Sequence, residues 1–355
     1  MTKTVVVLPG EDAAPEAMEP SIALLERMGL PIRWSFPLVG EAAMRQSGDP
    51  FPDSARAAID AADATLFGAT SGASARALFY LRWGKQTYAN VRPLRWSKGF
   101  CSSLADPSGI DLVLVRENLE DLYLYAEGEI AELAPLSLHS LTAGKRVDEL
   151  GEGSFAIKAI TRRGSERVIR YAFEVARRRK AAGRPGHLTL GAKWNMLPRT
   201  DGLFREVGAA IASEYPDVKF ETLLIDDLAH RLTARPASFD VLVMPNLYGD
   251  VLSDAAAGLV GGLGLAPSGC YGDDYAYFES AHGTAPDLVG RHVINPTATL
   301  LSASMMLEYL GFADAAAAIE RAVRAAYAEG TILTPDQGGT ATTGRFCDAV
   351  EANLR

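Results

Sequence analysis

Cysteine is scarce in this sequence, and long hydrophobic runs are absent. Its three cysteines, Cys101, Cys270 and Cys347, show neither paired spacing nor companion histidines at the intervals of a zinc site. We therefore expect reduced, unpaired thiols in a cytoplasmic protein. No stretch approaches the ~20 apolar residues of a membrane span, and residues 1–8 enter a strand pattern without the features of a signal sequence.

Positive charge is also in deficit. The chain has 35 Lys and Arg against 44 Asp and Glu, and this net charge of −9 argues against nucleic acid or an anionic membrane as partner. A small anionic substrate stays open if arginines gather locally. The length of 355 residues suggests about two domains, and 48% hydrophobic residues can form a sizeable core. Scattered glycines and prolines, 33 and 19, favour α/β architecture over a helical bundle.

The N-terminal region has the pattern of strands followed by turns and helices. Residues 5–8 form a short buried strand, and the next turn leads into a helix that extends to about Met28. A strand at residues 64–68 is followed by a loop of small and hydroxyl-bearing residues. The next segment, residues 74–83, has helical composition and ends near Gly84. We expect this helix and the loop to line a pocket.

Residues 239–260 are the most informative stretch. The run 240–244 predicts a buried strand, the Pro/Asn/Gly cluster at 245–249 a turn, and the alanine-rich segment that follows a helix. Ligands of α/β sheets bind beyond the carboxyl ends of the strands, which is where Asp250 and Asp254 fall. Their spacing of four places both carboxylates on one face of the first helical turn, a geometry that suits a hard cation. The alternative is acidic residues that favour the helix dipole and bind nothing.

Three arginines occupy comparable places. Arg82 lies on the predicted helix, whereas Arg92 and Arg116 are each expected to close an apolar strand. Each arginine by itself is explained as a solvated surface residue. Together they indicate a carboxylate-binding cluster, because guanidinium groups hold carboxylates through paired hydrogen bonds.

Two further strands bring polar residues to their carboxyl ends. A strand at 187–192 leads to Lys193 and Asn195, and one at 219–225 leads to Asp226 and Asp227. The section from Glu117 to about Glu152 is polar and irregular, and we expect an arm used for association.

The most specific motifs of the chain are residues 88–93, residues 115–118 with Tyr123, residues 246–250 with Ser253 and Asp254, and residues 282–287. Together they resemble those of the β-decarboxylating dehydrogenases, the family of isocitrate, isopropylmalate, homoisocitrate and tartrate dehydrogenases. The resemblance covers nearly the whole chain, and the glycine-rich residues 259–269 are most similar to the homoisocitrate branch.

The resemblance implies a fold of two α/β domains with an active-site cleft between them, different from the standard Rossmann fold. The larger, discontinuous domain on the cofactor side would comprise residues 1–87 and 261–355. The smaller domain, residues 88–260, would carry the metal and catalytic residues and a dimerisation arm. The implied partner is a second copy of the chain, because two subunits of this family share each site, with Lys193 and Asp226 reaching across.

The resemblance also implies roles for individual residues. Lys193 would assist removal of the hydroxyl proton and Tyr123 would protonate the enol left after carbon dioxide departs. The substrate carboxylates would be held by Arg82, Arg92 and Arg116, and Mg²⁺ or Mn²⁺ by Asp226, Asp250 and Asp254. NAD would be bound by Asn195 near the nicotinamide and by His282, Gly283, Thr284, Ala285, Asp287 and Asn295 around the adenosine.

The sequence departs from the family at places that bear on specificity. Its first turn, residues 11–14, lacks the usual glycines, and the loop 69–77 is shortened. Leu78 and Phe79 stand four and three residues before Arg82, so all three share roughly one helix face. This apolar face favours an alkyl or aryl substituent on the malate, unless Arg76 folds inward to hold a distal carboxylate.

We therefore expect NAD-dependent, metal-dependent oxidative decarboxylation of a 3-isopropylmalate-like substrate. NAD is expected because Asp287 would repel a 2′-phosphate and no cation stands beside it at Leu288. Homoisocitrate, isocitrate, tartrate and D-malate are the alternative substrates. A non-catalytic regulatory subunit would be indicated by loss of a site residue, and all are present. Metal-dependent hydrolysis would leave the arginines and the adenosine loop unexplained.

Overall fold

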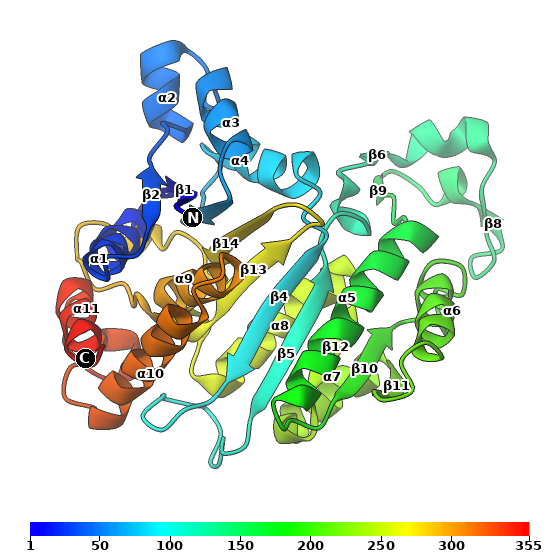
Figure 1. Cartoon of the computed structure of the whole chain (residues 1–355). Helices are drawn as coiled ribbons and strands as arrows, with labels where there is room; N and C mark the ends of the chain where they lie inside the picture. Colours follow the sequence, from blue (N-terminus) through cyan, green and yellow to red (C-terminus); the bar gives the residue numbers. More distant parts are fainter. Residues whose placement is uncertain (355) are drawn as a thin grey trace.

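The computed structural model describes residues 1–354, and its centre is one ten-stranded mixed sheet (Figure 1). Its strands, in spatial order, are β11 (Lys219–Leu224), β10 (His187–Ala192), β12 (Val241–Met244), β5 (Asp111–Glu117), β4 (Ala89–Arg95), β13 (Pro267–Tyr271), β14 (Ala276–Ser280), β3 (Ala64–Phe67), β1 (Lys3–Leu8) and β2 (Ile32–Ser35). The pairs β5–β4, β4–β13 and β13–β14 are antiparallel and the others parallel. This order differs from the parallel order of a standard dinucleotide-binding sheet, and the predicted α/β class is confirmed.

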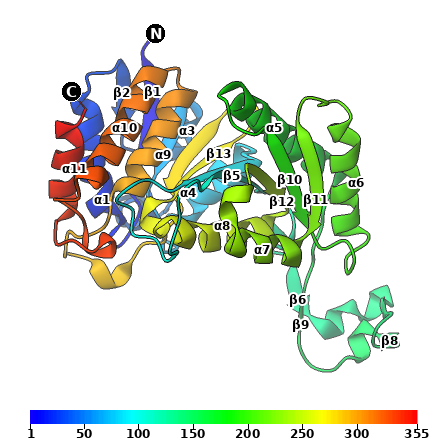
Figure 2. The same ribbon diagram turned by 90° about the horizontal axis from the view of Figure 1, so that it is seen from below.

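Helices cover both faces of the sheet (Figure 2). Those of the described residues are α1 (Ala14–Arg27), α2 (Gly40–Ser47), α3 (Asp53–Asp60), α4 (Ala75–Phe79), α5 (Arg162–Ala181), α6 (Thr200–Ala212), α7 (Ile225–Ala234), α8 (Asn246–Val260), α9 (Thr297–Tyr309), α10 (Ala313–Glu329) and α11 (Thr343–Ala352). The predicted strand, turn and helix order of the N-terminal region is confirmed by β1 and α1.

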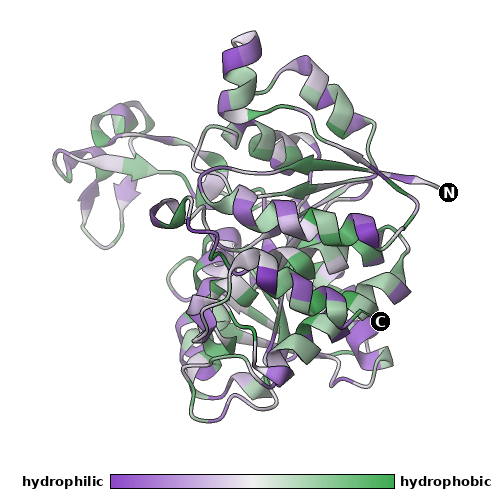
Figure 3. Cartoon of the chain, turned by 90° about the vertical axis from the view of Figure 1, so that its left-hand side faces the viewer, coloured by the Kyte–Doolittle hydropathy of each residue, from purple (hydrophilic) through white to green (hydrophobic). Residues whose placement is uncertain are grey.

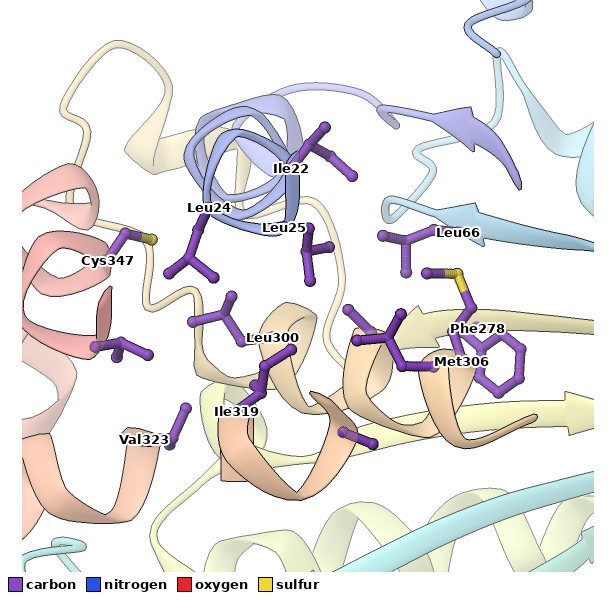
Figure 4. Packing of buried hydrophobic residues seen from close by; sticks show 14 of the residues in the cluster. Ile22, Leu24, Leu25, Leu66, Phe278, Leu300, Met306, Ile319, Val323 and Cys347 are labelled. Atoms are coloured by element: carbon purple, nitrogen blue, oxygen red, sulfur yellow. The ribbon is translucent and has the colours of Figure 1, made fainter. Parts of the chain in front are cut away.

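The largest hydrophobic cluster lies where α1, α9, α10 and α11 pack on one half of the sheet. In Figure 4, Leu25, Leu66, Phe278, Met306 and Ile319 point toward one another from five different elements. A second cluster joins α5 and α6 to one face of β5, β10 and β12, and a third joins α7 and α8 to the other face. Burial of these side chains supplies most of the drive to fold.

The division into residues 1–87 with 261–355 and residues 88–260 stays a prediction. The distribution of buried side chains favours it, because nearly all members of the largest cluster lie outside 88–260, and nearly all members of the second and third lie within. Phe100 is an exception, since it packs against Tyr327 with ring centroids 4.6 Å apart.

The polar section forms an arm that projects from the body of the molecule (Figure 2). It contains the antiparallel pairs β6 (Glu127–Glu129) with β9 (Ser154–Ala156) and β7 (His139–Ser140) with β8 (Lys145–Arg146). Hydrophobic residues occur along it beside hydrophilic ones (Figure 3), and Leu136 and Leu141 are 63% and 98% exposed. The use of this arm in association stays a prediction that these exposed side chains favour.

The turn predicted at residues 245–249 was wrong. Residues 245–249 are not a turn, because α8 begins at Asn246, directly after Pro245 at the N-cap position, and Gly249 donates its backbone N–H to the Pro245 carbonyl. Asp250 therefore lies beyond the first helical turn. Gly249 permits close packing, since a Cβ there would lie 2.6 Å from the Arg116 side chain. The glycine reflects a close approach of helix to strand.

The cysteines are unpaired, as expected: Cys101 is exposed, and Cys270 and Cys347 are buried. Within residues 1–354, no helix combines the length and apolar character needed to cross a bilayer.

Candidate active site

Two of the predicted arginines meet on the paired strands β4 and β5. Arg92 does not close a strand as expected, but lies in the middle of β4. It still approaches Arg116, because β4 runs antiparallel to β5 and its beginning lies beside the carboxyl end of β5, with Asn90 opposite Arg116. Both side chains are almost fully buried, at 7% and 3% exposure for the residues.

The arginines face the two aspartates of α8. Arg92 Nη1 lies 2.6 Å from Asp254 Oδ1, and its Nη2 lies 3.6 Å from Asp250 Oδ1. Arg116 forms an ion pair with Asp250. Burial raises the pKa of Asp250, but Arg116 and other donors outweigh it and hold that pKa below its usual value. Burial raises the pKa of Asp254, and the Asp250 carboxylate acts in the same direction.

Tyr123 completes this group. Its Oη donates a hydrogen bond of 2.5 Å to Asp250 Oδ2, and the guanidinium groups of Arg116 and Arg82 lie 4.9 and 5.4 Å from its ring centroid. Burial and the Asp250 carboxylate raise the pKa of this phenol. The structure therefore brings six predicted residues together: Arg82, Arg92, Arg116, Tyr123, Asp250 and Asp254.

Two residues of this group were missed by sequence reasoning. Asn246 accepts hydrogen bonds from Arg116 Nε at 2.9 Å and Arg82 Nη2 at 3.5 Å, and so sets the positions of both guanidinium groups. Glu279, near the end of β14, has its pKa raised by burial, while the charges of Arg82, Arg92 and Arg116 act against that shift. Glu279 directly follows the apolar run 276–278, as Arg116 follows the apolar run 112–115, and that pattern was the available signal.

Lys193 and Asp226 form a separate pair. Lys193 Nζ lies 2.6 Å from Asp226 Oδ1, and the Asp226 side chain is 64% exposed. Both follow the carboxyl ends of their strands as predicted, and Asn195 lies exposed beside them. Within residues 1–354, no three acidic, histidine or cysteine side chains are gathered closely enough to hold a metal ion. One chain thus offers Asp250 and Asp254 at one place and Asp226 at another.

Lys158, whose side chain is 14% exposed, links the two groups. Lys158 Nζ lies 3.3 Å from Asp121 and 2.8 Å from Asp201. Asp121 accepts the backbone N–H of Leu247 at the start of α8, and Asp201 accepts the backbone N–H of Lys193.

Hydrogen bonds join the first turn, residues 11–14, to the loop 69–77. The Glu11 carboxylate accepts hydrogen bonds from the backbone N–H groups of Ser71, Ala73 and Ser74 and from the Thr70 hydroxyl. These bonds lower the pKa of Glu11 despite its partial burial, which acts in the opposite direction. Gly10 has φ +83°, and a Cβ there would lie 2.4 Å from the Ala69 carbonyl oxygen. The carboxylate of Glu11 thus fixes the conformation of the loop 69–77.

The helix carrying Arg82 ends in a wider turn than expected. α4 passes directly into a π-helical turn at Tyr80–Gly84, and such turns are frequent at functional sites. Phe79 is 39% exposed and packs against Trp83 and Tyr125, with ring centroids 5.3 and 5.5 Å away. Leu78 is half-buried against the cluster that contains Leu81. Arg76 pairs instead with Asp49 at 2.8 Å.

The predicted adenosine loop borders a cavity of about 530 Å³, whose lining includes His282, Gly283, Ala285 and Asn295. His282 Nε2 is buried and has no hydrogen-bond partner within residues 1–354, so its hydrogen-bonding capacity is unused. Thr284 is buried and Asp287 exposed. Asn295 Nδ2 is already engaged, because it donates to Tyr327 and Asp336. A nucleoside moiety fits a cavity of this size with one unpaired polar atom.

The chemistry of the carboxylates fits a hard divalent cation. The Asp250 and Asp254 side chains are 33% and 45% exposed, they repel each other, and Arg92 contacts both. Carboxylate oxygens are the ligands that Mg²⁺ and Mn²⁺ prefer.

Known proteins resemble this chain over its whole length. A family profile described as isocitrate/isopropylmalate dehydrogenase matches residues 4–350. The 3-isopropylmalate/3-methylmalate dehydrogenase of Methanocaldococcus jannaschii is 40% identical over 99% of this chain and 98% of that protein. The isocitrate/homoisocitrate dehydrogenase of Thermus thermophilus is 38% identical over 100% and 99%. The crystal structure of isocitrate dehydrogenase from Methylococcus capsulatus superposes with a TM-score of 0.85 at 36% identity, over 100% of both chains.

Proposed function

Because this chain belongs to the isocitrate/isopropylmalate dehydrogenase family, we propose that it converts a 3-substituted malate to a 2-oxo acid with NAD and Mg²⁺ or Mn²⁺. The reaction class follows from the family: the chain is a decarboxylating dehydrogenase that acts on a CH–OH group. The substrate, the choice of nicotinamide cofactor and metal ion, the site residues and the assembly are the parts that we propose.

The convergence of three guanidinium groups and two carboxylates beside one phenol carries the proposal. Arg82 donates one short hydrogen bond, 2.9 Å from its Nε to the Asn118 carbonyl, so most of its donors remain for a substrate carboxylate. Arg92 and Arg116 lie beside it. A guanidinium group can bind a carboxylate through two parallel hydrogen bonds, so these arginines suit the two carboxylates of a malate. The cavity beside the predicted adenosine loop supports the proposal further, because it would accommodate a nucleoside of the cofactor, which a hydrolase would not need.

Each residue then has a defined task. When bound, NAD would accept the hydride of the carbinol carbon, and the divalent cation, held by Asp250, Asp254 and Asp226, would stabilise the charge that develops as carbon dioxide leaves. Lys193 takes the hydroxyl proton. Tyr123 donates its Oη proton to the enol carbon, and its raised pKa keeps it protonated until that step.

The active unit in this proposal is a homodimer. Lys193 and Asp226 are paired with each other and are not gathered with Asp250 and Asp254 in one chain. A second copy would supply them across the interface. The exposed apolar side chains of the arm favour such an interface, because apolar side chains at that exposure gain from burial against a partner. We propose that this dimer acts in the cytoplasm.

The substituent on the malate is proposed to be apolar, as in 3-isopropylmalate. Phe79, Trp83 and Tyr125 form an aromatic group next to Arg82, which would leave a distal carboxylate unpaired at a cost of several kcal/mol. Arg76 could pair that carboxylate, but its ion pair with Asp49 directs it elsewhere. The relative named as an isocitrate/homoisocitrate dehydrogenase favours the alternative, a substrate with a distal carboxylate.

The cofactor is proposed to be NAD. Asp287 can accept hydrogen bonds from ribose hydroxyls and would repel a 2′-phosphate. One charged hydrogen bond contributes ~1.5–3 kcal/mol, which corresponds to about tenfold or greater preference for NAD over NADP. Arg291 lines the same cavity and is the residue that would support a 2′-phosphate.

One panel tests these points. The purified enzyme with Mn²⁺ is given NAD or NADP and, in turn, isopropylmalate, homoisocitrate, isocitrate, tartrate and D-malate, and cofactor reduction is followed. We expect the highest kcat/KM with isopropylmalate and NAD. A tenfold preference for homoisocitrate or isocitrate would contradict the apolar substituent, and equal rates with NADP would contradict NAD. Absence of turnover with every substrate would instead indicate a non-catalytic regulatory subunit.

A further inference from the structure

A second group of arginines lies at the opposite end of β4 and β5 from the predicted active site. Arg95 ends β4, Asp111 begins β5, and the two residues are paired across the strands. Arg92 and Arg95 are three residues apart, so they point to opposite faces of the sheet. Arg92 meets α8, whereas Arg95 lies on the other face, between α5 and α10 (Figure 1).

Two adjoining cavities open at this place, with volumes of about 460 and 260 Å³. They share Arg95, Arg184 and Arg324 in their linings. The smaller cavity continues inward against apolar side chains, which include Phe100, Leu265, Leu301, Met305 and Val323. The combined space has a basic mouth and an apolar inner wall, and we call it the basic cavity. Its volume lies within the usual range for small-ligand sites.

Positive charge is in excess around the basic cavity. The Asp111 carboxylate is shared by three guanidinium groups, since Arg95 lies 3.3 Å and Arg179 3.1 Å away and Arg184 also contacts it. Arg179 has a second partner, Asp240 at 2.5 Å, and Arg324 pairs with Glu320 at 2.7 Å.

Lys98 lines the larger cavity and forms no ion pair within residues 1–354. Five cations thus face three carboxylates, a local excess of two positive charges in a chain whose net charge is −9.

The excess acts on Arg324 in particular. Burial lowers the pKa of this guanidinium, and the charges of Arg95 and Arg184 lower it further, while Glu320 acts in the other direction. An anion between these guanidinium groups would relieve their repulsion, because charge interactions in a partly buried site are screened little by water.

We propose that the basic cavity binds a small organic dianion. Its phosphate or paired carboxylates would meet Arg95, Arg184 and Arg324, and its apolar part would lie against Leu301 and Val323. Phosphate and carboxylate groups each present a pair of acceptor oxygens that one guanidinium group can bind through two parallel hydrogen bonds. The cavity walls come from α5 and β5 on one side and from α9 and α10 on the other, so a bound dianion would connect the two hydrophobic bodies away from the predicted active site.

Calorimetric titration with phenyl phosphate and with phenylsuccinate tests the proposal. All proteins carry Arg92→Gln, because the arginines of the active site would also bind a dicarboxylate. Arg324→Gln and Arg184→Gln each remove one guanidinium of the cavity. Arg177→Gln is the matched control, since Arg177 lies on the exposed side of α5, where it pairs with Asp217 and Glu174.

We expect at least one probe to bind, about tenfold more weakly after Arg324→Gln or Arg184→Gln and unchanged after Arg177→Gln. Binding should also raise the melting temperature of the Arg92→Gln and Arg177→Gln proteins, and less so that of the cavity variants. The probe that binds identifies the head group. The proposal is overturned if neither probe binds, or if both cavity variants bind as tightly as the control.

Discussion

Lys158 Nζ lies 2.8 Å from one carboxylate oxygen of Asp201, and the other oxygen of Asp201 accepts the backbone N–H of Lys193 at 2.8 Å. The same ammonium group lies 3.3 Å from Asp121, and 4.5 Å from the ring centroid of Tyr248 on α8. A single, largely buried cation therefore holds the loop that carries the predicted base and the start of the helix that carries the predicted metal ligands Asp250 and Asp254. Its contacts are with Asp121, Asp201 and Tyr248, which do not belong to the predicted catalytic or metal-binding residues, so we regard it as a positioning residue.

Replacement of this lysine should affect both stability and turnover. Lys158→Met leaves Asp121 and Asp201, both 0% exposed, without a cation, which costs about 3 kcal/mol or more of unfolding free energy. We expect kcat to fall more than KM rises, with partial recovery in Lys158→Arg. Lys3→Met is the control, because its partly exposed pair with Asp63 contributes less than about 1 kcal/mol. Equal urea midpoints for Lys158→Met and the parent protein would contradict this role.

Metal dependence should require Asp250, one of the three proposed metal ligands. Asp250→Asn removes a charged ligand from a hard cation, so we expect Mn²⁺ binding and turnover to weaken together by about tenfold or more. Asp227→Asn, next to the predicted ligand Asp226 but paired with Arg231, should retain both. Turnover of the parent enzyme after chelation should be restored by Mn²⁺. Full activity of Asp250→Asn at low Mn²⁺ concentration would show that this carboxylate is not a ligand.

Active sites shared between subunits should be visible by mixing. Lys193→Ala and Asp250→Asn proteins are each expected to be inactive, but a mixed dimer would contain one site with neither substitution. After subunit exchange, which is checked by mass spectrometry of tagged chains, part of the parent activity should return. Lys193→Ala mixed with Asp226→Asn is the control, since those residues are paired in one chain and no intact site can form. Exchange without recovery would place each site within a single chain.

Substrate preference should respond to Phe79. Phe79→Arg introduces a guanidinium beside Trp83 and Tyr125, where a distal carboxylate would lie, so kcat/KM should shift by about tenfold or more from isopropylmalate toward homoisocitrate. Phe36→Arg, at another exposed phenylalanine, should leave the ratio unchanged. An unchanged ratio for Phe79→Arg would mean that this side chain does not face the substituent.

Glu117 should make stability depend on pH. Burial raises the pKa of its carboxyl from 4.5 to about 7, although backbone N–H groups of Glu120 and Leu119 donate to it. The folded protein therefore favours the neutral acid, whose stabilisation is full below pH 4.5 and is lost as pH rises to about 7.

Glu117→Gln cannot titrate, so its unfolding free energy relative to the parent should increase across this window and then level off. Urea unfolding at both ends of the window measures the difference. A constant difference would show that Glu117 is ionised in the folded protein throughout.

Local sequence spacing determined much of the candidate site. The alternation of apolar runs and turns predicted the strands that deliver Arg116, Lys193 and Asp226, because a strand end in an α/β sheet is recognisable from hydrophobicity alone. The spacing of four residues between Asp250 and Asp254 placed both on one helix face wherever the helix began. Motif resemblance supplied the family, since it compares residue identities over the whole chain.

Only the tertiary structure decided which residues meet. Arg92 reaches Asp254, 162 positions away, because β4 is antiparallel to β5, and a sequence does not reveal strand order. Gly249 marks close packing on Arg116 and not a turn, and Arg76 turns to Asp49. The shared burial of Lys158 with Asp121 and Asp201, and the charge excess around Arg324, arise from packing between distant segments. Periodicity fixes the face on which a side chain lies, whereas only the folded arrangement of faces fixes its partners.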